Sequence, residues 1–294
     1  MFQSPQHELL RRRLQVDLYE WQRSRSDREP MELEPLELWR LGHELLRHRL
    51  DDLPLERSHA LLSEAGVLPL GAVGRAQLDA LMLDVEPIAQ ALLADRGGAP
   101  VTTRAVEVDL PVGGVRLQGH LRHHDGTGLR IPHFSQPSAR HQIELWILHL
   151  VACALEPNRP ITSMLVGRGE KHSARIVRFD TVTEPLPLLQ DLATIHAIGM
   201  CEPLPFFPKA SMVFVESFGR KPQDGWMPAL DAARTSFFDR RLGEAHDAAV
   251  SRIFGGADPL ARDFSPFGQP LAAGDFMQLS VRVLQPLRAH RREA

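Results

Sequence analysis

Apolar residues recur three and four positions apart through the first third of the chain, which is the spacing of amphipathic helices. This spacing predicts helices over residues 1–18, 36–50, 55–65 and 76–94, the last bent or restarted near Pro87. A composition break follows at Gly97–Pro100. We therefore interpret residues 1–98 as an N-terminal helical segment that packs on a core formed by residues 99–294.

The pattern changes after this break. Apolar and polar residues alternate, as in half-buried strands, and strands are predicted over residues 102–110, 115–121, 129–133, 162–166 and 174–179. Helical spacing returns over residues 136–155, 187–200, 209–218, 227–240, 244–254 and 275–291. The order predicts an α/β (α+β) fold with a central sheet flanked by helices.

The composition is that of an ordinary soluble protein, with 43% hydrophobic and 24% charged residues in 294. The formal net charge of −3 provides no overall basic field. Contact with nucleic acid would therefore need a local basic patch or a larger assembly.

Cys153 and Cys201 are the only cysteines, and both lie in apolar helical stretches. We expect core thiols in a reducing compartment. No apolar run is as long as a membrane span and no signal-peptide pattern opens the sequence, so we expect a cytoplasmic protein without membrane contact.

Residues 106–155 follow the order strand, strand, loop, strand, helix, which is typical of a metal-dependent DNA nuclease core. Such a centre needs an acid late in one strand and an acid-x-lysine triplet in the next, because carboxylates hold Mg²⁺. The corresponding positions hold Arg122, Pro132 or His133, and Phe134 or Ser135. We expect no catalytic residue, metal or cofactor here, and hence a pseudo-enzyme.

An alternative interpretation assigns metal binding and catalysis to other side chains. Glu107, Asp109, Asp125 and His133 could be relocated ligands of a stand-alone metal-dependent nuclease or hydrolase. Several histidines also crowd this segment, at positions 120, 123, 124, 133, 141 and 149, and imidazole suits transition metals. Strand alternation, however, places His120 and Arg122 on one face and His123 on the other, so we expect an exposed or interface edge.

Several segments then point to a family. The opening LLRRRLQVDL, the lead-in GVLPLGAVGRAQLDAL, the block GVRLQGHL with ELWILHLVACAL, the segment PLPFFPKAS and the tail FMQLSVRVLQPL occur in this order. In this order they resemble the C-terminal region of RecC, the gamma subunit of bacterial exodeoxyribonuclease V. The helicase-like upstream part of that family has no counterpart in this sequence.

The resemblance implies a restriction-endonuclease-like fold of the PD-(D/E)xK type whose catalytic residues are lost. It also implies a scaffold that sits between RecB-like and RecD-like subunits and guides DNA in break repair and recombination. Cationic side chains in the sheet segment can meet phosphates. The candidate DNA or partner contacts are Arg116, His120, Arg122, Arg130, Arg140 and Arg168.

Overall fold

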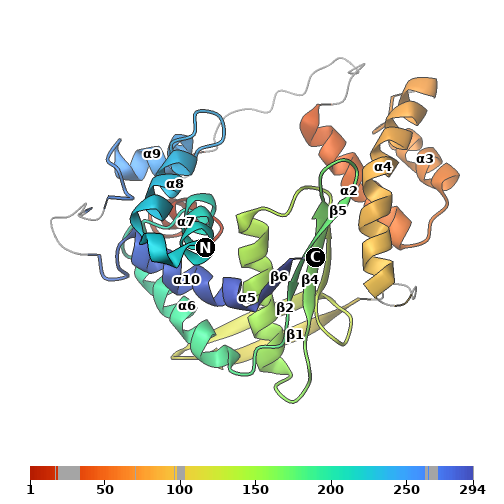
Figure 1. Cartoon of the computed structure of the whole chain (residues 1–294). Coiled ribbons are helices and arrows are strands. Elements are labelled where there is room, and N and C mark those ends of the chain that lie inside the picture. The colour runs from red at the N-terminus through yellow and green to blue at the C-terminus, as the bar shows by residue number, and fades with distance from the viewer. Residues whose placement is uncertain are drawn as a thin grey trace.

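The strands predicted in the middle of the chain form the sheets of the computed structural model, and helices precede and follow them (Figure 1). The structure describes residues 1–16, 18, 34–69, 71–95, 97, 103–261, 264 and 271–293. The architecture confirms the predicted mixed α/β class.

The strands of the described chain form a two-stranded and a four-stranded sheet. Their bounds are Arg104–Val112 (β1), Val115–His124 (β2), Arg130–His133 (β3), Ser163–Arg168 (β4), Ala174–Phe179 (β5) and Arg291–Glu293 (β6). The hairpin β1–β2 is antiparallel and connects to β3 through a bridge between His124 and Leu129. The larger sheet has the order β3-β4-β5-β6, with β3 parallel to β4 and the other neighbours antiparallel.

The helices fall into groups before, within and after the sheets. Their bounds are Pro5–Glu8 (α1), Pro35–Leu50 (α2), Leu55–Glu64 (α3), Gly71–Asp95 (α4), Ala139–Leu155 (α5), Pro185–Gly199 (α6), Pro208–Arg220 (α7), Met227–Phe237 (α8), Ala248–Phe254 (α9) and Phe276–His290 (α10). The parallel pair β3 and β4 is joined by α5, as a parallel connection requires.

Some predicted elements need correction. The helix expected over residues 1–18 begins at Pro5 and ends, after a π-helical segment over Leu9–Arg13 (η1), at Arg13. Pro87 does not interrupt α4, which is one continuous helix. The strand β6 was missed, because residues 291–293 are too few to show alternation. Cys153 is buried as expected, but Cys201 is exposed just after α6.

The four-stranded sheet is covered on both faces. Residues of β4 alternate between two apolar clusters: Leu165 joins Val177 and Phe179 on the side of α5, whereas Met164 and Val166 face α4. A strand buried on both faces carries a continuous apolar run, as β4 does. Figure 1 shows α5 and the α2–α4 group on opposite sides of this sheet.

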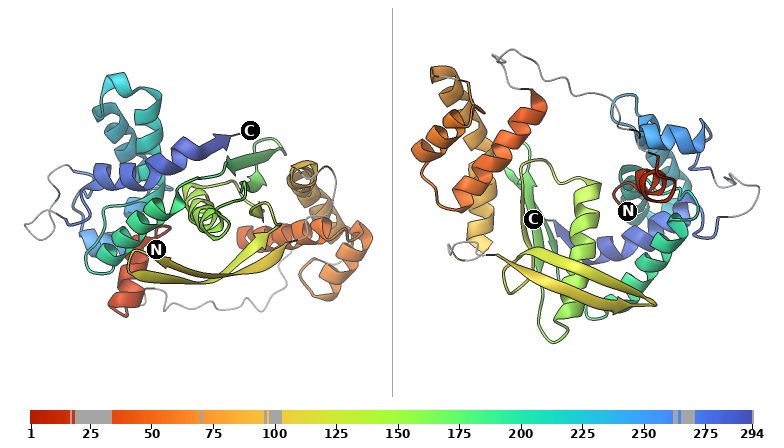
Figure 2. Two further views of the ribbon diagram at one scale, coloured as in Figure 1. Left: turned by 90° about the horizontal axis from the view of Figure 1, so that it is seen from below. Right: turned by 180° about the vertical axis from the view of Figure 1, so that it is seen from behind.

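The remaining helices extend the α5 side. Cluster residues on α7, α8 and α10 pack together there, and Phe2 from the N-terminus joins them. The ring of Phe2 meets that of Phe206 edge to face, with centroids 6.1 Å apart. Figure 2 shows the β1–β2 hairpin reaching past the four-stranded sheet on this side, where β1 contacts α5 and α6.

A glycine lets α2 approach the loop after β3. Gly42 is buried, and a Cβ atom at this position would overlap the ring of Phe134. Phe134 is only 1% exposed, and the guanidinium carbon of Arg168 lies 4.8 Å from the centre of its ring. The ring therefore has little room to move away, and the position of α2 depends on this contact.

We expect Gly42→Ala to destabilise the protein by about 1–2 kcal/mol, although alanine usually stabilises a helix relative to glycine. The reason is overpacking against Phe134, which forces a side chain or the helix to shift. Urea unfolding followed by circular dichroism would measure it. The double variant Gly42→Ala with Phe134→Leu should recover part of the loss, because leucine lacks the ring. A stabilised single variant would contradict this account.

Candidate functional site: an imidazole- and arginine-lined pocket

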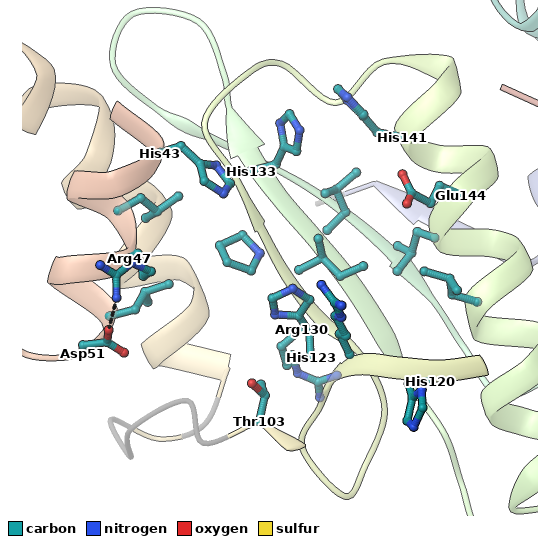
Figure 3. A pocket seen from close by; sticks show the side chains of 18 residues that line it. His43, Arg47, Asp51, Thr103, His120, His123, Arg130, His133, His141 and Glu144 are labelled. Atoms are coloured by element: carbon teal, nitrogen blue, oxygen red, sulfur yellow. Dashed lines mark hydrogen bonds and ion pairs between the residues drawn. The ribbon is translucent and has the colours of Figure 1, made fainter. Parts of the chain in front are cut away.

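A pocket of about 640 Å³ lies between α2, β2, β3 and α5 (Figure 3). Most of its polar lining is basic or imidazole: His43, Arg47, His120, Arg122, His123, Arg130, His133 and His141. Its acidic lining residues in the described chain are Asp51 and Glu144. Asp51 pairs with Arg47 at 3.5 Å, and Glu144 accepts a 2.7 Å hydrogen bond from Gln3. The pocket therefore presents an excess of groups that bind anions.

A β-bulge directs two of these groups into the pocket. Arg104 pairs with His124 and Val106 with Leu121, so Arg122 and His123 together oppose the single residue Ala105. His123 has φ 61°, a left-handed conformation. A bulge of this kind re-aims a side chain. Strand alternation had placed His123 on the face opposite Arg122, which is wrong, since both line the same pocket.

Three imidazoles approach one another from separate elements. The ring of His133 on β3 lies 4.1 Å from that of His141 on α5 and 6.1 Å from that of His43 on α2, measured between centroids. Figure 3 shows His43 directed across the pocket towards His133. Burial, together with the smaller effects of the charges of His141 and His43, lowers the pKa of His133 to about 4. His133 is therefore neutral at pH 7.

Burial also lowers the pKa of His141 and of His123, and the Arg122 charge adds to the effect on His123. Partial burial thus makes His133, His141 and His123 harder to protonate, and nearby positive charges add to this effect at His133 and His123. Arg122 is exposed, and no described side chain forms an ion pair or hydrogen bond with its guanidinium. It is the lining group most available to an anion.

Arg130 lines the pocket, but its guanidinium already interacts with other groups of the protein. Its side chain is 8% exposed and its Nε lies 2.8 Å from Asp95 and 3.5 Å from Asp125, whose side chains are 9% and 2% exposed. Its Nη1 also donates to the carbonyl oxygen of Thr162 at 2.7 Å. This network ties β3 to the end of α4 and to the turn after β2, so Arg130 is the least accessible of the six predicted contact residues.

The other predicted contact residues do not all lie in this pocket. His120 and Arg122 line the pocket. Arg116 lies near the hairpin turn and forms an ion pair with Asp109, with 2.6 Å between Nη2 and Oδ2. Arg140 is exposed on the first turn of α5. Arg168, at the end of β4, covers the Phe134 ring and pairs with Asp84 at 3.3 Å.

The carboxylates considered as relocated ligands do not meet His133. Asp125 stabilises its own turn, since its Oδ1 accepts the backbone N–H groups of Thr127 and Gly128. Glu107 is exposed on β1, two residues from the ion-paired Asp109. Within the described ranges, no group of three or more His, Cys, Asp or Glu side chains is arranged to hold a metal ion.

Sequence reasoning missed the contribution of α2. Trp39 and His43 lie one turn apart on this helix, and their rings stack with centroids 5.5 Å apart. Trp39 also contacts His133, at 6.1 Å. Their spacing could have shown that they share a helix face. Nothing in the sequence showed that this face meets β3.

The fold and the pocket define a mixed α/β domain with a cation- and imidazole-lined site. The family follows from the sequence: the profile of the RecC C-terminal domain matches residues 1–219, and the chain belongs to this family. This finding confirms the resemblance read from the sequence motifs.

The chain is similar to curated RecC proteins. It is 29% identical to the RecBCD enzyme subunit RecC of Mycobacterium tuberculosis (strain H37Rv) over 239 residues, which is 80% of this chain and 21% of the relative. It is 26% identical to that of Escherichia coli (strain K12) over 234 residues, 79% of this chain and 20% of the relative. The chain thus spans about a fifth of the length of these relatives. No helix in the described residues is long and apolar enough to cross a membrane.

Proposed function

We propose that the chain is a non-catalytic scaffold and DNA-guiding domain of a RecBCD-type helicase–nuclease, exodeoxyribonuclease V, acting in double-strand break repair and recombination. Its partners are RecB-like and RecD-like subunits and the DNA held by the assembly. Membership of the RecC C-terminal domain family carries this proposal. The relatives named above are subunits of the RecBCD enzyme.

We further propose that the core is a restriction-endonuclease-like PD-(D/E)xK fold that has lost its catalytic residues. The order of a hairpin, a third strand, a helix and a strand parallel to the third supports it. Arg122, Pro132 and His133, at the positions where the nuclease acids are expected, all line the pocket. Arginine in place of a carboxylate repels Mg²⁺ and attracts phosphate.

Co-purification with the RecB- and RecD-like subunits of the same cell, at moderate and high salt, tests the scaffold role. We expect a stable stoichiometric complex, and the chain alone should not hydrolyse DNA with Mg²⁺. If no complex forms at moderate salt or at high salt, the proposal is contradicted. Mg²⁺-dependent hydrolysis that is lost with Asp109→Ala and Asp125→Ala would support the nuclease reading instead.

The three exposed arginines of the predicted contact set test the DNA-guiding role. We expect joint replacement of Arg116, Arg122 and Arg140 by glutamine to weaken binding of forked DNA by the assembled complex about tenfold or more. Each lost phosphate contact should also reduce the slope of log K against log salt by about 1. Fluorescence anisotropy across a salt series would measure both.

A matched control replaces three exposed arginines on helices outside the pocket, Arg57, Arg75 and Arg252, by glutamine. This variant has the same change in net charge. If both triple variants weaken binding equally, only overall charge matters and the assignment of the three residues is wrong.

A further inference from the structure

Four rings form a series of pairwise contacts that leads from Trp39, beside the pocket, to the lining residues His43, His133 and His141. Trp39 stacks on His43 with an interplanar angle of 24°, and both contact His133, which in turn contacts His141. Trp39 is 36% exposed, so part of its ring is accessible to a ligand. An exposed aromatic ring beside cationic groups is the arrangement that proteins use to stack unpaired bases.

The groups that surround these rings come from several elements. His43, Arg47 and Asp51 lie on α2, and Arg140, His141 and Glu144 on α5. The hairpin strand β2 supplies His120, Arg122 and His123, and β3 supplies Arg130 and His133. Asp51 is paired with Arg47, and Arg130 with buried aspartates. The available positive charge is therefore that of Arg122, of the exposed Arg140 and of any imidazole that gains a proton.

We propose that this pocket and the adjoining Trp39 ring bind one nucleotide of a single DNA strand, with the base against Trp39 and the phosphate beside Arg122 and His133, and that binding takes up protons. The inference rests on the proposed DNA-guiding function and assigns its specificity to particular residues. It makes Trp39 the stacking residue and the histidines a proton-linked anion site.

Proton uptake follows from the setting of the imidazoles. Partial burial and neighbouring positive charges keep the pKa of His133 and of His123 below the usual value. A phosphate in the pocket would reverse the second effect, because a nearby negative charge favours the protonated ring. Ligand and proton therefore bind cooperatively, and affinity rises as the pH falls.

His141 is less suited to gain a proton. Its Nδ1 accepts the backbone N–H of Ser138 at 3.2 Å, which caps α5. Protonation of this nitrogen would remove the capping bond. His133 is different, because its Nδ1 faces the hydroxyl of Ser135 at 2.7 Å, and a hydroxyl can accept as well as donate.

The stacking step is tested with the 294-residue chain and two labelled oligonucleotides of equal length, oligo(dT) and its abasic analogue. Anisotropy titrations should show that Trp39→Leu weakens oligo(dT) binding about tenfold and leaves abasic binding unchanged. Trp39→Phe should restore most of the affinity, because it keeps an aromatic face. An equal loss for both oligonucleotides, or no preference of the native chain for oligo(dT), would overturn the proposal.

The proton step is tested by repeating the oligo(dT) titration at pH 6 and pH 8 at constant ionic strength. We expect the native chain to bind about fivefold more tightly at pH 6. The double variant His133→Gln with His123→Asn should lose most of this difference, and asparagine tolerates the left-handed backbone at position 123. His172→Gln, an exposed imidazole outside the pocket, should keep it. A pH dependence that survives the double variant would contradict proton uptake at these residues.

Subunit assembly separates this inference from the proposed function. Trp39→Leu should still co-purify with the RecB- and RecD-like subunits. If it assembles and oligo(dT) binding does not depend on Trp39, the stacking site is wrong and the scaffold role stands. If the native chain does not assemble, the scaffold role fails, whatever the oligonucleotides show.

Discussion

Arg130→Met is expected to destabilise the protein by about 3–5 kcal/mol, as the removal of one partner from a buried ion pair does. The substitution keeps an unbranched side chain of similar length but leaves the carboxylates of Asp95 and Asp125 in a site where both are at most 9% exposed. Arg178 still pairs with Asp95 at 2.8 Å, which places the expected loss near the lower end. Urea unfolding at pH 7 would measure it.

The control for this experiment is Arg122→Met, on the neighbouring strand. Arg122 is exposed and no described carboxylate pairs with it, so its replacement should change the unfolding free energy by no more than about 0.5 kcal/mol. For DNA binding the order should be reversed. When both variants are folded, Arg122→Met should bind DNA more weakly than Arg130→Met. A loss below about 1 kcal/mol for Arg130→Met would show that the buried network contributes little.

The second large effect is a loss of stability in acid that depends on His149. This residue lies on α5 in the core, 0% exposed, and its ring contacts those of Trp146 and Phe179. Its Nε2 donates to the carbonyl oxygen of Asp180 at 2.9 Å, and its Nδ1 lies 2.9 Å from the hydroxyl of Ser163. Burial lowers its pKa to about 4, so the folded protein holds a neutral imidazole.

In the unfolded chain this imidazole has a pKa near its usual value of 6.5. Between pH 6.5 and 4 the unfolded state therefore binds a proton that the folded state does not, so the protein becomes less stable as the pH falls. The contribution of His149 is complete above pH 6.5 and is lost as the pH falls to about 4. The expected loss is about 3 kcal/mol. Denaturant unfolding from pH 8 to pH 4.5 would measure its onset and slope.

His149→Gln should be less stable at pH 8 by about 1–2 kcal/mol, because glutamine cannot reproduce both hydrogen bonds and the ring packing. Its unfolding free energy should also fall less steeply as the pH falls, because up to one proton fewer is taken up on unfolding. His120→Gln, which changes an exposed side chain on β2, should alter the unfolding free energy little at pH 8. A decline as steep in His149→Gln as in the native chain would assign the acid sensitivity to other groups.

The sequence alone determined the elements that depend on local pattern. Helical spacing identified α2 through α5, and alternation identified β1 and β2, because neighbouring residues decide which face of an element is apolar. The motifs indicated the family, and the sequence shows Arg122, Pro132 and His133 at positions where a nuclease-like core would be expected to carry carboxylates. The N-terminal helix was overextended, since Leu14 continues the apolar spacing but is 57% exposed in the fold.

The tertiary structure decided the site. Residues 39 and 43 reach the histidine of β3 only because α2 crosses the loop after that strand, over a glycine that leaves room for Phe134. Arg130 looked as available as Arg122 in the sequence, and only the approach of Asp95 from α4 buried it. His123 joined Arg122 because a bulge broke the alternation. Local periodicity fixes which face of an element is apolar, whereas the partner of that face and the burial of each charge depend on contacts between segments far apart in the chain.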